Sequence, residues 1–159
     1  MAVRGSARWL ESEDFTALDL GELSRLVART SERELRHRLI GGVREIALRE
    51  IFRRMPEYLR PARAEGFDAV VGWQITGASG GGVDEYRILV SDGTCRVLTG
   101  HRDPPAISVR TDAATLLRIV TGNEDPVLAV LKQRLSVRGD LALAARLSKL
   151  FAVGPRTPQ

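Results

Sequence analysis

The chain has 159 residues, of which 43% are hydrophobic and 28% are charged, a composition typical of a single folded domain. A domain of this length buries roughly 70% of the surface of its unfolded chain, so a core can form without a metal or a disulfide. The single cysteine, Cys95, excludes an intramolecular disulfide and fits a reducing cytoplasm. No run approaches the roughly 20 apolar residues of a membrane span, and the N-terminus lacks the apolar segment of a signal peptide.

The N-terminal segment predicts a short helix. Asp19 and Glu22 have the spacing of a capping box in which Asp replaces Ser or Thr. Apolar residues then recur on one helical face, which predicts a helix over about 20–29. We interpret residues 1–30 as an N-terminal arm that carries this helix and that covers a binding site or mediates dimerisation.

A second helical region follows the arm. Ser31 and Glu34 form another capping box, and the apolar residues behind them keep helical spacing as far as Pro56. Gly41 and Gly42 interrupt this pattern. Each glycine costs about 1 kcal/mol in a helix interior, so we expect the helix to break or bend there.

The hydrophobic period then changes from helical to alternating, which predicts strands over 67–76 and 84–90. One face of the first strand is formed by Ala69, Val71, Trp73 and Ile75, and one face of the second by Tyr86, Ile88 and Val90. The glycine-rich run 77–82 between them is interpreted as a hairpin turn, because no helical pattern follows it. It also lacks the Gly-Lys-Ser/Thr ending of a phosphate-binding loop.

Two more strands are expected over 94–100 and 105–111. Asp92-Gly93 is a strong hairpin signature between the second and third strands. Four successive strands with tight connections predict an antiparallel sheet or meander. Cys95 falls within the third strand, and we expect it to be a buried strand residue rather than a reactive thiol.

The last third of the chain returns to helices, each preceded by an aspartate. The expected N-caps are Asp112 before 113–121, Asp125 before Pro126 and 127–133, and Asp140 before 141–151. A further strand over 134–139 separates the last two helices, and residues 154–159 are expected to form a flexible tail. The order of elements predicts an α+β domain over 31–153, with helices laid on one face of a sheet.

Nothing in the sequence predicts catalysis or a metal site. His37 lies among arginines on a charged helix face, and His101 lies in a loop beside Arg102 and Asp103. Neither has the convergent ligands that a metal needs. The three capping aspartates have a sufficient structural role, so a catalytic carboxylate pair is not required. We therefore expect no enzyme activity and no cofactor.

The net charge of +4 comes almost entirely from arginine, because Lys132 and Lys149 are the only lysines. Many arginines fall on the second helical region, between 33 and 54, where they alternate with glutamates. Glu45 with Arg49, and Glu50 with Arg53 and Arg54, have the spacing of ion pairs within a helix. This pattern favours a solvated, ion-paired face, and nucleic-acid binding is the alternative.

The run from Ile107 to Phe151 resembles the sterol carrier protein type 2 family. The features that carry the resemblance are the strand leading to Asp112, the Leu-rich helix ending in Thr121-Gly122-Asn123, the opening Asp125-Pro126, the strand Leu135 to Val137, and Arg138-Gly139-Asp140 before a small-residue helix. Upstream, the runs WQI, YRILVSDG and CRV are similar to the first strands of the family. The resemblance covers about 32–153, and the N-terminal arm departs from the family pattern.

The resemblance implies a five-stranded, mostly antiparallel sheet covered on one face by helices, with an apolar tunnel that opens near the last helix. It implies no catalytic residues. The inner sheet face would form the floor of the tunnel, and the C-terminal helices would form its lid. The expected ligand-binding residues are Trp73, Ile75, Tyr86, Ile88, Val90, Ile107, Leu116, Val120, Leu131, Leu147 and Phe151. Alternation points Arg110 and Arg138 away from the apolar face, so neither is expected to hold a head group.

The leading hypothesis is a noncatalytic, cytoplasmic lipid-binding or lipid-transfer domain, monomeric or homodimeric. Its partner would be a hydrophobic small molecule such as a fatty acid, a fatty acyl-CoA or a sterol-like lipid. Transient contact with a membrane surface is compatible with this hypothesis, and no nucleic acid is required. One alternative is an accessory module, with a collapsed pocket, for a lipid, quinone or polyketide enzyme. The other is a nucleic-acid-associated protein that acts through the arginine-rich helix.

Overall fold

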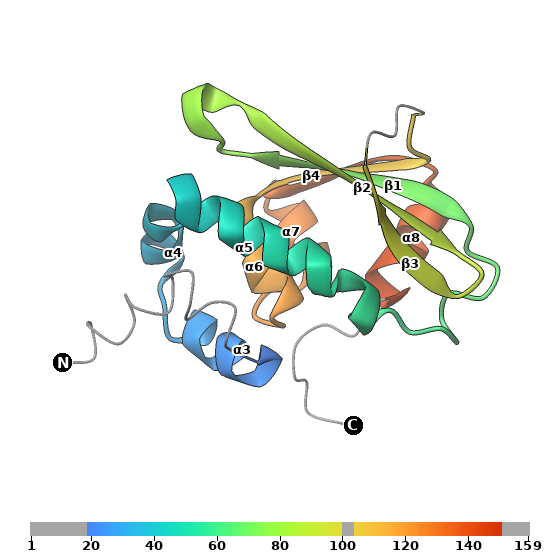
Figure 1. Cartoon of the computed structure of the whole chain (residues 1–159), viewed down its shortest axis with the longest axis horizontal. Helices are drawn as coiled ribbons and strands as arrows, with labels where there is room; N and C mark the ends of the chain where they lie inside the picture. The colour runs from blue at the N-terminus through green and yellow to red at the C-terminus, as the bar shows by residue number, and fades with distance from the viewer. Residues whose placement is uncertain (1–18, 100–103, 151–159) are drawn as a thin grey trace.

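A computed structural model describes residues 19–99 and 104–150, except for the side chain of Ser148 (Figure 1). The predictions for residues 1–18, His101, Phe151 and the tail 154–159 lie outside the described residues. The elements in chain order are α3 (Leu20–Ala28), α4 (Glu32–Arg38), α5 (Gly41–Arg54), η1 (Met55–Tyr58), β1 (Ala69–Thr76), η2 (Ser79–Gly81), β2 (Val83–Ser91), β3 (Thr94–Leu98), β4 (Ile107–Asp112), α6 (Ala113–Val120), α7 (Pro126–Leu131), β5 (Leu135–Gly139) and α8 (Leu141–Leu150).

The capping interactions predicted from the sequence are present. Asp19 Oδ1 accepts the N–H of Glu22 at 2.7 Å, and Glu22 Oε1 accepts the N–H of Asp19 at 3.0 Å. This reciprocal pair opens α3 and satisfies two N–H groups that the first helical turn leaves without partners. Likewise, Asp112, Asp125 and Asp140 each accept a backbone N–H at the start of α6, α7 and α8, respectively.

The predicted break at the glycine pair is confirmed. Helix α4 ends at Arg38, and α5 begins at Gly41 after an extended residue, Ile40 (φ −132°, ψ 159°). Gly41 has φ +56°, a left-handed conformation that glycine adopts at little cost. Helix α5 then runs to Arg54, where the turn η1 contains Pro56 and ends the helical region.

The strands form one five-stranded mixed sheet in the order β3-β2-β1-β4-β5. Three of the four pairs are antiparallel, as predicted, but β1 and β4 are parallel, with Trp73 opposite Val109. The prediction that all four successive strands continue one antiparallel arrangement is therefore wrong for β4. Alternation identifies which face of a strand is buried, but it does not specify which strand is its neighbour.

The residues just before β4 contact β1 closely. Ala106 donates its N–H to the carbonyl oxygen of Val70 at 2.9 Å, and Pro105 lies against Gly72. A Cβ on Gly72 would approach Cγ of Pro105 to 2.8 Å, closer than atoms normally pack. Glycine at this position therefore allows the chain to reach the parallel position beside β1.

The described helices lie on one face of the sheet, as predicted (Figure 1). Between the two layers lies a continuous core, which includes the fully buried Val71, Ile75, Ile88 and Ile107 from the sheet. Leu116, Leu117 and Leu48 are among the buried residues that pack onto it from the helices. The domain is thus an α+β structure of one sheet and one helical layer.

Within 19–99 and 104–150, none of the helices has the length and apolar character needed to cross a bilayer.

We expect Gly139→Ala to destabilise the fold, and Gly42→Ala to serve as its control. Gly139 has φ +112°, and a Cβ there would collide with the carbonyl oxygen of Ala106. Urea denaturation should show a loss of roughly 2 kcal/mol or more in the free energy of unfolding. No atom lies within 4 Å of a Cβ on Gly42, which is helical, so that substitution should stabilise by about 0.5 kcal/mol. Equal effects of the two substitutions would contradict this account.

Candidate ligand-binding cavity

A partly open cavity of about 420 Å³ lies between the sheet and the helices. Its volume is within the range of about 300–1,000 Å³ that is usual for small-molecule sites. Apolar side chains form nearly all of its wall. The lining residues are Leu20, Leu23, Glu50, Ile51, Arg54, Met55, Tyr58, Trp73, Val109, Leu116, Ile119, Val120, Pro126, Val127, Val130, Leu135, Val137, Ala144, Ala145, Leu147 and Lys149.

The floor of the cavity is one row of side chains across three strands. Trp73 on β1 pairs with Val109 on β4, which in turn pairs with Val137 on β5. Alternation directs all three toward the helices. The Trp73 ring also packs edge-to-face with Phe52 of α5, with ring centroids 5.8 Å apart and an interplanar angle of 72°. The floor therefore depends on the parallel pairing of β1 with β4.

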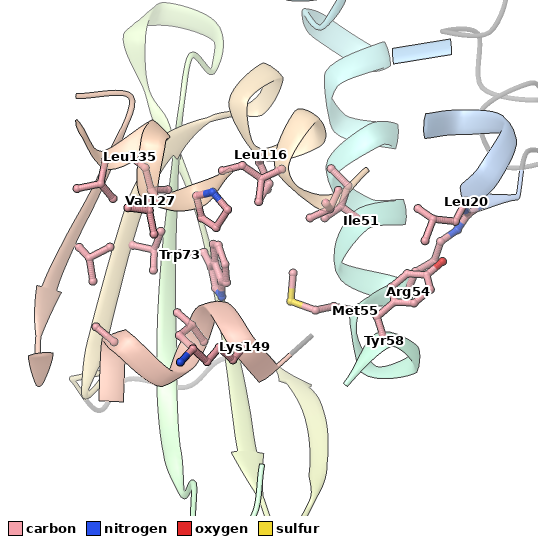
Figure 2. A pocket seen from close by; sticks show the side chains of 18 of the residues that line it. Leu20, Ile51, Arg54, Met55, Tyr58, Trp73, Leu116, Val127, Leu135 and Lys149 are labelled. Carbon is pink, nitrogen blue, oxygen red and sulfur yellow. The ribbon is translucent and has the colours of Figure 1, made fainter. Parts of the chain in front are cut away.

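Helices α5, α6, α7 and α8 and the turn η1 form most of the walls. In Figure 2, Ile51 and Met55 face Trp73 across the open centre of the cavity, while Leu116 and Val127 lie on the α6 and α7 side. Helix α8 contributes residues of different sizes, including Ala144 and Leu147. Small residues on α8 leave volume that a row of leucines would fill.

Helix α3 also forms part of the wall, through Leu20 and Leu23. Two long-range hydrogen bonds join it to the end of α6. Ser24 donates its hydroxyl to the carbonyl oxygen of Thr121 at 2.7 Å, and the Asn123 amide donates to the carbonyl oxygen of Ser24 at 3.1 Å. The described part of the N-terminal arm is thus docked onto the domain, where it closes one side of the cavity.

The buried charge at the cavity wall is neutralised. The Glu50 side chain is only 8% exposed, and it accepts hydrogen bonds from Arg53 at 2.8 and 2.9 Å and from Arg54 at 3.1 Å. The hydrogen bond from Arg53 lowers the pKa of Glu50 below its ordinary value of 4.5, although burial acts in the opposite direction. Glu50 therefore stays ionised and paired beside the apolar wall.

The predicted ligand-binding residues fall into three groups. Trp73, Leu116, Val120 and Leu147 line the cavity. Ile75, Ile88, Val90 and Ile107 are fully buried in the adjoining core and are not part of the lining. Tyr86 lines a different cavity, Leu131 is 72% exposed, and Phe151 lies outside the described residues. A ligand-binding role for each of these residues remains a prediction.

The prediction from sequence missed several lining residues, because hydrophobic periodicity does not reveal where the packing of the core is incomplete. Val109 and Val137 share the alternation of their strands with core residues, and only the sheet order places them beside Trp73. Val127 and Val130 lie on the short helix α7, where six residues are too few for a helical face to be recognised. Arg110 and Arg138, by contrast, are exposed and absent from the lining, in agreement with their predicted orientation.

A second cavity, of about 700 Å³, lies between α5 and the β1–β2 hairpin. Its walls are more polar. Arg44, which is 4% exposed, pairs with Asp84 and donates to the carbonyl oxygens of Ile75 and Thr76 at 2.9 and 3.0 Å. These interactions give Arg44 a structural role in joining α5 to the hairpin. Burial, followed by the charge of Asp84, raises the pKa of Tyr86, whose ring stacks on Phe52 in this cavity.

No catalytic arrangement appears among the described residues. Gly77, Ser79 and Gly81 do match the letters of a nucleophile elbow, Gly-x-Ser-x-Gly, but the turn leads into β2, whereas an elbow connects a strand to a helix. No group of three or more His, Cys, Asp and Glu side chains could hold a metal ion in the described part of the chain. Burial raises the pKa of the half-buried Cys95 to about 11, which disfavours the reactive thiolate at neutral pH.

A one-sided sheet, a helical layer and an apolar cavity between them define a sterol-carrier-like domain. The model of the SCP-2 sterol transfer family matches residues 48–152, about two thirds of the chain, and the chain belongs to this family. Domains of this family bind and transfer lipids and are generally noncatalytic. The match begins within α5, so α3 and α4 lie outside it. No curated protein gives a significant match to the sequence.

Solved structures with a similar fold include lipid carriers and an enzyme. The sterol carrier protein domain 2 of Helicoverpa armigera is 16% identical, with 55% of this chain and 68% of that chain covered and a TM-score of 0.49. The inverting sec-alkylsulfatase of Pseudomonas sp. is 17% identical, with 66% of this chain but only 16% of that chain covered and a TM-score of 0.50. The palmitated SCP2L2 of Aedes aegypti is 20% identical, with 62% and 88% covered and a TM-score of 0.47. The chain spans about a sixth of the sulfatase, and that likeness concerns the fold alone.

Glu50→Gln should change how stability depends on pH. Because the pKa of Glu50 is lower in the folded state, its carboxylate stabilises the fold above about pH 4.5, and this contribution is lost as the pH falls through the folded-state pKa. The difference in free energy of unfolding between wild type and Glu50→Gln should therefore shrink on acidification, measured by urea denaturation. Glu45→Gln, on the exposed face of the same helix, controls for the loss of a charge from α5. A difference that grows below pH 4.5 would refute the assignment.

Proposed function

We propose that this protein is a noncatalytic carrier that holds a lipid in the cavity between the sheet and helices α3, α5, α6, α7 and α8. The observation that carries the proposal is a cavity of about 420 Å³ whose wall is apolar. Glu50, the acidic group of the lining, is neutralised by Arg53 and Arg54. Such a wall gives an aliphatic ligand a place away from water, and it places no unpaired charge of Glu50 beside the ligand.

The expected ligand is a fatty acid, a fatty acyl-CoA or a sterol-like lipid. Burial of each methylene contributes about 0.8 kcal/mol, so a chain of about sixteen carbons gains roughly 12 kcal/mol before the costs of association. Immobilisation and ordering offset much of this gain, which leaves room for micromolar binding without a charged anchor. An apolar wall discriminates chain length and shape by only a few kcal/mol, so we expect a class of lipids rather than one species.

The alternative functions receive less support from the structure. An accessory module with a collapsed pocket would require side chains to fill the space in front of Trp73, and that space is open. Nucleic-acid binding through the arginine-rich helices would need basic groups free of acidic partners. Many of these arginines are instead paired, as in Arg36–Glu32, Arg38–Glu34, Arg44–Asp84, Arg53–Glu50 and Arg54–Glu50.

Native mass spectrometry after mild purification tests the proposal directly. We expect a co-purified lipid, or a one-to-one complex after delipidated protein is incubated with palmitic acid. Titration with a fluorescent fatty acid then gives the dissociation constant. Protein that neither carries nor accepts an acyl chain or a sterol would contradict the proposal.

Filling the cavity should abolish binding without unfolding the protein. Ala144 lines the cavity on α8, whereas Ala142 lies on the same helix, is exposed and is not part of the lining. We expect Ala144→Phe to weaken fatty-acid affinity at least about tenfold, since the added ring occupies volume that the chain needs. Ala142→Phe should bind like the wild type. Circular dichroism confirms that both variants are folded, and equal affinities of the two variants would place the ligand elsewhere.

A further inference from the structure

Helix α7 exposes an unusual amount of apolar surface for its length. Of its six residues, only Ala129 is buried. The four large side chains are all exposed, at 59% for Val127, 47% for Leu128, 43% for Val130 and 72% for Leu131. Contiguous apolar patches of this kind mark contacts with a partner or a membrane.

This apolar surface is continuous with the cavity. Val127 and Val130 line the cavity and are also exposed, so the same side chains belong to its wall and to the outer surface. Leu128 and Leu131 extend the surface outward and are not part of the lining. A lipid that moves past α7 would therefore remain against apolar groups on its way into the cavity.

The two lysines of the chain lie at the end of α7 and at the cavity. Lys132 is the C-cap of α7, and Lys149 lines, from α8, the cavity that Val127 and Val130 also line; both lysines are exposed. Of the neighbouring acids, Glu124 has a side chain only 5% exposed, which pairs with Arg118 at 3.2 Å. Asp125 caps α7 by accepting the N–H of Val127 at 2.8 Å and keeps its charge. Lysines beside an apolar helix suit a bilayer interface, because their stems follow apolar groups while their ammonium groups reach phosphates.

From these observations we propose that α7 docks this protein onto the surface of an anionic lipid bilayer, with Val127, Leu128, Val130 and Leu131 inserted among the lipids. The proposal rests on the proposed function, because it gives the lipid in the cavity its route from a membrane. Helix α7 is only about 9 Å long, whereas a stable protein interface buries about 800 Å² on each partner. Insertion of a few side chains instead gives weak, reversible binding, which suits a carrier that must leave the membrane again.

Vesicle co-sedimentation tests this docking surface with the full chain. The probes are phosphatidylcholine vesicles with and without phosphatidylglycerol. We expect binding that requires the anionic lipid and weakens with salt. The double variant Leu128→Gln/Leu131→Gln should lose at least about tenfold in vesicle affinity, while its affinity for a fluorescent fatty acid in solution stays within about twofold of the wild type. Glutamine keeps the helix propensity close to that of leucine.

The matched control is Ile40→Gln/Leu141→Gln. These two side chains are 61% and 74% exposed, and neither belongs to α7 or lines the cavity. Ile40 precedes α5, and Leu141 follows the end of β5 opposite to the end that α7 enters. The control should bind vesicles like the wild type, and equal losses in the two double variants would overturn the proposal.

The remaining outcomes separate this proposal from the proposed function. Fatty-acid binding without vesicle binding would overturn the docking surface and leave the carrier function standing. Vesicle binding through α7 without any lipid in the cavity would overturn the carrier function alone. A third outcome is a wild-type protein that does not bind vesicles but forms a dimer, while the variant Leu128→Gln/Leu131→Gln is monomeric. This outcome would show that a second copy of the chain covers α7, and it would also refute the docking proposal.

Discussion

The parallel pairing of β1 with β4 is the constraint on which the rest of the structure depends. It inserts β4 and β5 on one side of β1, while β2 and β3 occupy the other side. The C-terminal helices that follow β4 and β5 are thereby brought over the same face that α5 already covers (Figure 1). The cavity lies between these two sets of helices, and its floor is the row Trp73, Val109 and Val137 that this pairing creates.

The cavity lies beside a fully packed part of the core. The core beside it is filled by Ile75, Ile88 and Ile107, which are completely buried. Above the cavity, α8 presents small residues such as Ala144. Side chains that line an apolar cavity make fewer dispersion contacts than side chains in the packed core, and a bound acyl chain would supply such contacts.

The N-terminal helices extend the domain beyond the part that the family model matches. Helix α3 lies before residue 48 and still supplies Leu20 and Leu23 to the cavity wall. Its hydrogen bonds with Thr121 and Asn123 fix its position, because a different placement of α3 would leave these half-buried groups without partners.

Leu131 of α7 has the helical spacing expected of a lid residue, but its side chain is exposed and extends the apolar surface beside the cavity.

The sequence by itself determined the local structure of this protein. Capping at Asp19 and Asp140 and the turn at Asp92-Gly93 follow from interactions within about four residues, and the strand alternation follows from the geometry of the backbone. Only the tertiary structure decided that β4 lies beside β1, that the void lies above Trp73, and that Leu131 is exposed. These features depend on the summed packing of segments far apart in the chain, and a void is a shortage of packing that no single residue encodes.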